Sequence, residues 1–307
     1  MDSLILATRG SPLALWQANA VAARLMSVHR NLSVQLHVVR TLGDRDQATQ
    51  ILGLSATGVF TKEVDACVLE GQAHAAVHSL KDQVTTLVEG LELRMVLKRG
   101  PVQDVFVGKN GVRLADLKPG ASVGTGSFRR IAQLRRIRPD IQVCAVRGNV
   151  ESRLGLARSG SLDGVLLAAA GLERLGLMGS DVERLDLSDF LPAPSQGIVG
   201  VTCRTEDQRT ADLLTLADDE GTHAVARAER AFLRTLHGGC NVPAGALCVR
   251  DPQGHLSLRG RVLSLDGRQC LEGREEGWTS NPEVLGRVIA EDLLRQGAGP
   301  LVAAERS

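Results

Sequence analysis

Short runs of apolar residues alternate with stretches of helical periodicity over the first two thirds of the chain. Residues 4–8 are an apolar run that predicts a strand, and Ser11 and Pro12 follow it as the cap and first position of a helix. That helix carries apolar residues every three or four positions, which favours one buried face. Further strands are predicted at residues 34–40, 75–80 and 91–97, with a helix at 61–70. Alternation of this kind is typical of an α/β domain.

The alternation begins again at residue 104 and ends in a proline-rich turn. In this stretch the pattern predicts strands at residues 104–107, 122–125, 141–146 and 165–169, and capped helices at 127–137 and 149–157. One more apolar run, residues 198–203, predicts a strand that returns to the first unit. We therefore expect two α/β domains, the first made of residues 1–97 with 198–217 and the second of residues 103–193.

The last third of the chain has a different pattern. Three strands are predicted in succession at residues 246–249, 256–265 and 269–275, between helices at 222–236 and 282–296. Consecutive strands without intervening helices favour an antiparallel sheet that has helices on one face. We expect residues 220–307 to form a smaller α+β domain.

Composition places the chain among globular proteins, because 43% of its 307 residues are hydrophobic and 23% are charged. Its longest apolar stretch, residues 164–172, is less than half the roughly 20 residues of a membrane span. The first ten residues lack the basic and apolar regions of a signal peptide, and the six cysteines show no CxxC pair. We therefore expect a cytoplasmic protein with reduced thiols and no membrane partner. We also expect no nucleic-acid partner and no metal site.

Arginine dominates the basic residues, since lysine occupies only five of the 36 Lys and Arg positions, although the net charge is +1. From residue 127 to 158 there are eight arginines against two acidic residues, Asp140 and Glu151. One explanation is a GC-rich coding sequence, which enriches arginine throughout. The other is that arginine binds carboxylates in a bidentate way, so that this segment serves to bind an anion.

Three predicted strand-to-helix junctions share a polar cap, a glycine and an arginine: residues 8–11, 125–130 and 146–149. Unpaired N–H groups and the helix dipole attract anions at such helix starts. Each junction alone is an ordinary capped turn. Because ligands of open α/β sheets bind beyond the carboxyl ends of the strands, the three together predict a cleft that holds a polyanion.

Asp82 stands directly after the predicted strand at residues 75–80, where such sheets often carry catalytic groups. The alternative is a solvated Asp82 that pairs with its neighbour Lys81. Strand alternation points His78 inward, so we expect a hydrogen-bonded core histidine there rather than a base.

Cys240 lies in a loop of turn-forming residues, 237–243, between a predicted helix and a predicted strand. The glycines before it leave the thiol accessible, whereas the other five cysteines lie in or beside apolar stretches. As a nucleophile it needs nearby positive charge that favours the thiolate. The alternative is that Cys240 is a small packing residue.

These stretches together resemble the porphobilinogen deaminase family. The matching motifs are long and occur in order along the chain, at residues 7–18, 78–82, 124–130, 146–153, 169–176 and 238–243. They include the sequences ATRGSPLALWQA and HSLKD near the start and GGCNVP near the end.

The resemblance implies an α/β protein of three domains, in which two are similar to type II periplasmic binding proteins and a C-terminal α+β domain carries the cysteine. It implies a transferase of haem and tetrapyrrole biosynthesis, with hydroxymethylbilane synthase activity. A dipyrromethane cofactor is joined to Cys240 by a thioether, four porphobilinogen molecules are condensed on it with loss of ammonia, and water releases the linear tetrapyrrole. The resemblance also implies a monomer that acts on porphobilinogen as its small-molecule substrate.

Site roles follow from the same resemblance, with Asp82 as the catalytic residue and Phe60 as an aromatic that lies against the pyrroles. The residues implied to bind cofactor and substrate carboxylates are Arg9, Ser11, Lys81, Thr125, Ser127, Arg129, Arg130, Arg147, Arg153, Arg174 and Gln196. Each pyrrole ring carries an acetate and a propionate, so six linked rings bear about 12 negative charges, a load suited to arginines and helix termini. A carboxylate at Asp82 can accept pyrrole N–H bonds and stabilise cationic pyrroles.

The chain departs from the family pattern in several places. Gln83 and Val84 follow Asp82, where the family has a proline two residues after the aspartate. The other departures are a loop without lysines at residues 53–58, Leu42 in place of a polar residue, and Ser195 in place of a glycine. One alternative function is therefore a weakened homologue that assembles the cofactor but turns over poorly. The other is a cytoplasmic anion-binding two-domain module, which gives the glycine-flanked cysteine no purpose.

Overall fold

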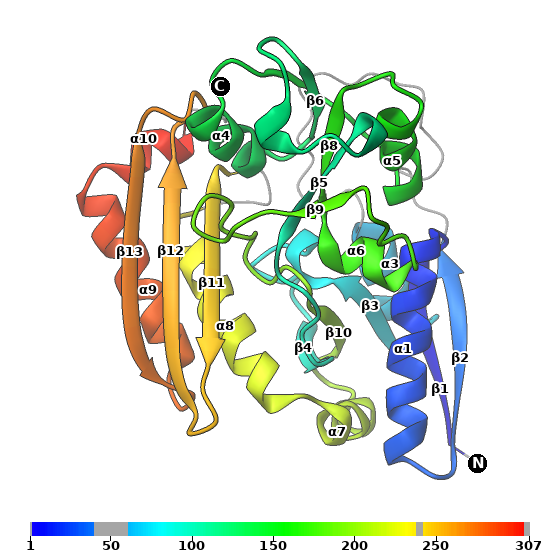
Figure 1. Ribbon diagram of the computed structural model, residues 1–307. Helices are drawn as coiled ribbons and strands as arrows, with labels where there is room; N and C mark the ends of the chain where they lie inside the picture. Colours follow the sequence, from blue (N-terminus) through cyan, green and yellow to red (C-terminus); the bar gives the residue numbers. More distant parts are fainter. Residues whose placement is uncertain (1, 40–60, 238–241, 304–307) are drawn as a thin grey trace. The chain divides into compact units, whose positions relative to one another are not determined.

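The structure, a computed structural model, describes residues 2–39, 61–237 and 242–303 (Figure 1). The predictions made for Leu42, residues 53–58, Phe60 and Cys240 lie outside the described residues. The backbone divides into two compact units, each described by itself below. Unit 1 comprises Met1–Gly100 and Ile198–Ala224, and unit 2 comprises Pro101–Gly197 and Val225–Ser307.

Unit 1 is an α/β sheet of five strands. The strands are β1 (Asp2–Arg9), β2 (Leu32–Val39), β3 (Ala75–Ser79), β4 (Leu91–Val96) and β10 (Val199–Arg204), and the helices are α1 (Pro12–Val28), α3 (Lys62–Leu69) and α7 (Gln208–Ala217). In the sheet order β2-β1-β3-β10-β4, β1 runs parallel to β2 and β3, whereas β10 is antiparallel to β3 and β4. The chain therefore returns to this sheet after the intervening part of unit 2.

Helix α1 shows how the sequence pattern produces the core of unit 1. Ser11 caps the helix, since its Oγ accepts from the backbone N–H of Ala14 at 3.3 Å, and Pro12 at the first position needs no acceptor. Its buried face, spaced by three and four residues, packs with β1, β3, β10 and α7 and consists of Ala18, Val21, Ala22 and Leu25.

Unit 2 contains a second five-stranded sheet, in the order β7-β6-β8-β5-β9. The strands are β5 (Asp104–Gly108), β6 (Ser122–Gly124), β7 (Gln142–Cys144), β8 (Gly164–Ala168) and β9 (Val182–Arg184), and the helices are α4 (Phe128–Ile137), α5 (Val150–Arg158) and α6 (Ala169–Arg174). Short 3-10 turns occur at Leu80–Asp82 in unit 1 and at Lys109–Gly111 and Leu114–Asp116 here. β6 is parallel to β7 and β8, and β5 is antiparallel to β8 and β9.

Alternate residues of β5 serve opposite faces of this sheet. Phe106 packs in one cluster with Leu134 of α4, whereas Val105 and Val107 pack in another with Leu154 of α5. The sheet is therefore covered by helices on both faces, as predicted for an α/β domain. Asp104 shares the α4 side with Phe106, which places its carboxylate toward α4.

The rest of unit 2 is a three-stranded antiparallel sheet with helices on one face (Figure 1). Its elements are α8 (Glu220–Thr235), which belongs to unit 2 from Val225 onward, β11 (Ala244–Arg250), β12 (His255–Leu263), β13 (Cys270–Trp278), α9 (Pro282–Arg295) and α10 (Ala298–Ala303). Gly286 lets α9 approach α8, because a Cβ there would lie 2.2 Å from the carbonyl oxygen of Ala228. The predicted architecture, two α/β sheets and a smaller α+β sheet, is confirmed.

The sequence pattern did not predict the strand β9 or the helices α6, α7 and α10. β9 and α6 are too short to show a period, and α7 and α10 follow other elements with little loop between. β7 is shorter than predicted, since its ladder with β6 ends at the pair Gly124 and Cys144.

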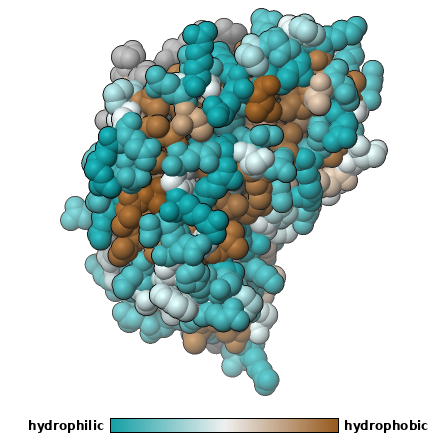
Figure 2. Space-filling view, turned by 60° about the vertical axis from the view of Figure 1, so that its left-hand side comes forward, coloured by the Kyte–Doolittle hydropathy of each residue, from teal (hydrophilic) through white to brown (hydrophobic). Residues whose placement is uncertain are grey.

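Figure 2 shows a face on which hydrophilic residues cover most of the surface and hydrophobic residues lie between them. Large apolar side chains that are exposed include Leu216, Val249 and Trp278, which lie on separate elements. Within the described ranges, no helix is both long and apolar enough to span a membrane.

Ser195 is held in a strained backbone conformation. Its φ is +64°, in the left-handed region that glycine adopts readily and other residues avoid. Its backbone N–H donates to the buried Glu229 carboxylate at 2.6 Å, which fixes the turn. The Ser195 hydroxyl is buried and has no hydrogen-bond partner among the described residues. A serine therefore stands where the backbone suits a glycine.

We expect Ser195→Gly to raise the free energy of unfolding by about 1 kcal/mol, because relief of the left-handed strain and of the unpaired hydroxyl exceeds the added flexibility of the unfolded chain. Urea denaturation measures the difference. Ser159→Gly is the matched control, since Ser159 has a φ of −74° and glycine offers no relief there. Unchanged or lower stability of Ser195→Gly would contradict this account.

His74, the residue before β3, forms two hydrogen bonds to β1, and one of them requires an unprotonated ring nitrogen. Its backbone N–H donates to the carbonyl oxygen of Ile5 at 2.9 Å, and its Nδ1 accepts the N–H of Ile5 at 2.9 Å. Burial lowers the pKa of His74 below 6.5; Asp207 opposes this, and Arg204 and Arg209 add to it. The ring must lose its Nδ1 proton to accept the bond.

The stability that this histidine contributes is complete above pH 6.5 and is lost as the pH falls below that value, because the unfolded chain then binds a proton that folded His74 resists. Wild-type protein should therefore lose more stability than His74→Gln between about pH 7.5 and 5.5, by less than about 1 kcal/mol because the ring is partly exposed. Thermal denaturation at both pH values measures this. Equal losses would remove His74 from the pH dependence.

Candidate active site

Asp82 and Lys81 stand on a turn that is fixed to the sheet of unit 1. The turn Leu80–Asp82 follows β3 directly, and the N–H of Leu80 donates to the carbonyl oxygen of Ile198 at 3.0 Å. The side chain of Leu80 is fully buried, whereas Lys81 is half-buried and Asp82 is exposed. The carboxylate of Asp82 is therefore accessible on a rigid support, as a catalytic group requires.

Gln83 follows this turn in an extended conformation. Its φ of −88° and ψ of 137° are extended, the conformation that a residue before proline adopts, and its side chain is buried. Val84 thus follows a backbone of the expected form.

His78 is the core histidine that strand alternation predicts. It is buried on β3, and its Nε2 lies 2.9 Å from Oδ1 of Asp65, which is buried on α3. The pair connects the strand before Asp82 to the first turn of α3. The expectation of a hydrogen-bonded core residue is confirmed.

Arg9 and Ser11 lie at the same edge of the unit 1 sheet as Asp82. β1 and β3 are parallel neighbours, in which Ala7 pairs with Ala76, so their carboxyl ends share one edge. Arg9 ends β1 and Ser11 caps α1, and both side chains are half-buried. This edge therefore gathers two basic side chains, a helix start and one exposed carboxylate.

Thr125 and Ser127 form the corresponding edge in unit 2, between β6 and α4. Thr125 is buried, and its Oγ1 accepts from the N–H of Ser127 at 3.2 Å. Ser127 is the N-cap residue of α4, but its own hydroxyl does not make a capping hydrogen bond to the helix. The first N–H groups of α4 therefore lack a side-chain cap from Ser127, which leaves them suited to an anion.

Arg129 and Arg130 both pair with Asp104 in the interior of unit 2. Oδ2 of Asp104 accepts from Arg129 Nη1 at 2.6 Å, and Oδ1 accepts from Arg130 Nη2 at 2.7 Å and Nε at 3.1 Å. Asp104 is 0% exposed, Arg129 3% and Arg130 5%. Burial alone would raise the pKa of Asp104, but the two guanidiniums outweigh it and hold that pKa well below its usual range.

Gln196 belongs to the same buried cluster. Its Nε2 donates to Oδ1 of Asp104 at 2.9 Å and to the carbonyl oxygen of Val102 at 2.7 Å. Arg174 lies beside this turn, where its Nη2 donates to the carbonyl oxygen of Gly197 at 2.6 Å. The structure thus brings Arg129, Arg130 and Gln196 together.

Arg147 and Arg153 flank the start of α5. Asn149 caps this helix by accepting from the N–H of Ser152 at 2.8 Å, and Gly148 has a φ of +105° that forms the turn. Arg147 is exposed and Arg153 half-buried. Because β6 and β7 are parallel neighbours, Arg147 and Thr125 follow strand ends at one edge of the sheet. Their roles in binding, like those of the other site residues, stay predictions.

Asp104 is the residue that sequence reasoning missed. Its signal was an acidic residue at the first position of an otherwise apolar strand, since a buried carboxylate needs cationic partners.

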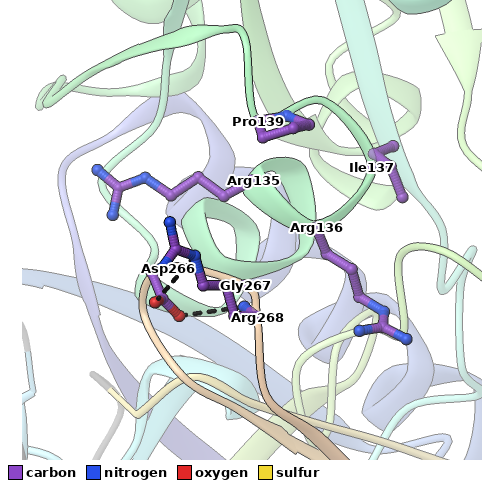
Figure 3. Close-up of a pocket in the computed structure, with 7 residues that line it drawn as sticks. All are labelled: Arg135, Arg136, Ile137, Pro139, Asp266, Gly267 and Arg268. Carbon is purple, nitrogen blue, oxygen red and sulfur yellow. Dashed lines mark hydrogen bonds and ion pairs between the residues drawn. The ribbon is translucent and has the colours of Figure 1, made fainter.

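A second basic surface lies elsewhere in unit 2, but its arginine side chains do not point toward one another. A pocket of about 750 Å³ is lined by Arg135, Arg136 and Arg268, but Figure 3 shows the guanidinium groups of Arg135 and Arg136 pointing to opposite sides.

Comparison with known proteins gives two family matches. Residues 4–212 match "Porphobilinogen deaminase, dipyromethane cofactor binding domain", and residues 224–295 match "Porphobilinogen deaminase, C-terminal domain". Among solved structures, YhfZ from Shigella flexneri is 16% identical with a TM-score of 0.39, covering 76% of this chain and 91% of that one. The VFT2 domain of BvgS from Bordetella pertussis is 14% identical with a TM-score of 0.43, covering 73% and 91%.

Relatives with the name porphobilinogen deaminase align over nearly the full chain. The protein of Xanthomonas euvesicatoria is 42% identical over 303 residues, which are 99% of each chain. That of Stenotrophomonas maltophilia is 43% identical over 302 residues, 98% of this chain and 99% of the relative. That of Syntrophobacter fumaroxidans is 40% identical over 291 residues, 95% and 94%. The chain therefore belongs to the porphobilinogen deaminase family, and its residues 4–212 form that family's dipyrromethane-cofactor-binding domain.

Proposed function

We propose that the chain is a hydroxymethylbilane synthase that joins four porphobilinogen molecules, with loss of ammonia, on a dipyrromethane linked to Cys240 and then releases the linear tetrapyrrole by hydrolysis. The observation that carries this proposal is the match of both family domains, which together account for residues 4–212 and 224–295. Each addition forms one carbon–carbon bond, expels one ammonia and frees one proton from a pyrrole carbon, so the reaction needs a group that handles protons.

The residues of the site fit a group rich in carboxylates. The buried cluster holds two guanidiniums but only one carboxylate, and Nε of Arg129 is buried without a hydrogen-bond partner in the described part of the chain. An anion at this point would receive a charge-assisted bond. When bound, the dipyrromethane supplies the pyrrole carbon that is extended, and its carboxylates need basic partners.

Binding of carboxylates is proposed for basic, hydroxyl and amide side chains at the two sheet edges and in the buried cluster of unit 2. In unit 1 these are Arg9, Ser11 and Lys81, and in unit 2 they are Thr125, Ser127, Arg129, Arg130, Arg147, Arg153, Arg174 and Gln196. Arg129, Arg130 and Gln196 are rigidly held, whereas Arg147 is exposed and can follow a ligand. We expect the buried members to position the cofactor and the exposed members to attract substrate.

Asp82 is proposed as the catalytic residue. Its carboxylate can accept pyrrole N–H bonds, stabilise positive charge that develops on the substrate and hold the proton that each addition frees. The exposed position at the end of β3 gives substrate access to it. Lys81 beside it can hold a substrate carboxylate, which would orient the ring.

Cys240 is proposed as the attachment site, and Phe60 as an aromatic surface for the pyrroles. In the sequence, Cys240 lies between the end of α8 and the start of β11. We further propose a cytoplasmic monomer that acts on a small molecule and binds no nucleic acid. Sedimentation of the purified protein would measure the assembly state.

We expect purified protein from a haem-synthesising host to carry a dipyrromethane adduct on Cys240. The intact mass should exceed the sequence mass by that adduct, and Cys240→Ser should have the bare polypeptide mass. Cys270→Ser is the matched control, since Cys270 is partly exposed yet lies on β13. A bare wild-type mass, or an adduct that persists in Cys240→Ser, would defeat the proposal and favour an anion-binding module.

Asp82→Asn should fold normally and lose activity by roughly 10²-fold or more, because an amide neither stabilises a pyrrole cation nor takes its proton. Asp116→Asn is the matched control, since Asp116 is also an exposed aspartate at the end of a 3-10 turn. The rate of bilane formation at saturating porphobilinogen measures the effect. A folded Asp82→Asn protein with near-normal turnover would remove Asp82 from the mechanism.

A further inference from the structure

We propose that Asp104 is a positioning residue, which holds the guanidiniums of Arg129 and Arg130 in place and thereby governs how readily the chain acquires its cofactor. This proposal rests on the proposed function, in which those arginines bind cofactor carboxylates. Asp104 itself stands at the start of β5, is 0% exposed and pairs with both arginines, so it acts through them.

Both oxygens of Asp104 are engaged. Oδ2 accepts from Arg129, and Oδ1 accepts from Arg130 and from Gln196. If Arg129 turned away, Oδ2 would lose its donor, and if Arg130 turned away, Oδ1 would keep the neutral Gln196 but lose its cationic partner; either loss is costly for a buried carboxylate. Asp104 therefore fixes the side-chain conformations of two arginines that are adjacent on the first turn of α4.

Backbone carbonyl groups complete the frame around this cluster. Arg129 Nη1 also donates to the carbonyl oxygen of Leu191 at 2.7 Å, and Arg130 Nη1 donates to that of Leu166 at 3.0 Å. These bonds tie α4 to β8 and to the segment before β10, all within unit 2. A ligand that meets these arginines meets groups whose positions are set before it arrives.

The charge of the cluster explains why one carboxylate suits the task. Two guanidiniums and one carboxylate leave one positive charge, and neither arginine pairs with another acidic residue within the described ranges. Without Asp104 the two like charges would repel each other in a buried site. With a second acid the pair would be neutral and would have no charge left for a ligand. One aspartate therefore keeps the arginines together and still leaves an unmatched positive charge.

A purely structural role is the competing explanation, and it makes a different prediction. If Asp104 only stabilises unit 2, its replacement lowers stability, but each molecule that remains folded takes up cofactor at the normal rate. If Asp104 positions the arginines, folded molecules take up cofactor slowly and need more porphobilinogen to do so. Uptake per folded molecule therefore separates the two.

The experiment prepares Asp104→Asn and Asp104→Glu as full-length apoprotein, adds porphobilinogen at several concentrations and follows the adduct by intact mass. Circular dichroism gives the folded fraction. We expect Asp104→Asn to acquire the adduct roughly tenfold more slowly or worse, with a higher half-saturating concentration. Asp104→Glu restores the charge at a changed length, so its rate should lie between those of Asp104→Asn and wild type.

Asp163→Asn is the matched control. Asp163 also lies in unit 2 and is half-buried. Its Oδ2 accepts from the N–H and hydroxyl of Ser122 at 2.8 Å. This contact lies where β6 and β8 begin, whereas Thr125 and the α4 arginines follow the end of β6. This variant should lose stability but acquire cofactor normally.

Each outcome decides between the explanations. Normal uptake by folded Asp104→Asn overturns the positioning role. If Asp104→Asn does not fold, normal uptake by Asp104→Glu overturns it, and failure of both variants to fold assigns Asp104 a structural role instead. The wild-type sample tests the proposed function separately. If the wild-type protein acquires no adduct, the proposed function fails, whatever the variants do.

Discussion

The buried ion cluster of Asp104 with Arg129 and Arg130 is the interaction on which the arrangement of unit 2 depends. It joins the first turn of α4 to the first residue of β5, and through Gln196 it holds the turn that leads into β10. Three charges are costly to bury, and these are tolerated because each is hydrogen-bonded as well as paired. The turn next to Gln196 is itself strained at Ser195 and is held by the buried carboxylate of Glu229.

The fold follows from the sequence because its signals are local. Apolar runs gave the strands and capped junctions gave the helices, so α1, α4 and α5 begin within one residue of the predicted position. Sheet order is different, since it depends on pairs far apart in sequence. The insertion of β10 between β3 and β4 joins residues more than a hundred positions apart, and only the apolar character of residues 198–203 hinted at it.

The candidate site was predictable residue by residue but not as an arrangement. The motifs predicted Asp82 and the arginines as site residues. Because neighbouring strands run parallel, these residues follow strand ends at one edge of each sheet. The partner of Arg129 and Arg130 was not named, because Asp104 lies 25 residues away from Arg129 and no spacing rule connects a strand start to a helix start. His78 was easier, since alternation alone predicts an inward side chain.

The arginine excess between residues 127 and 158 has more than one cause, and the partners separate them. Arg138 pairs with Asp140 and donates to the carbonyl oxygen of Leu114, and Arg158 pairs with Asp181, so both serve the surface of the fold. Arg135 and Arg136 stand in the last turn of α4, where cations favour the helix dipole. Composition explains such residues adequately. Arg129 and Arg130 differ because they are buried beside one shared carboxylate, an arrangement that composition cannot produce and that leaves positive charge for a ligand.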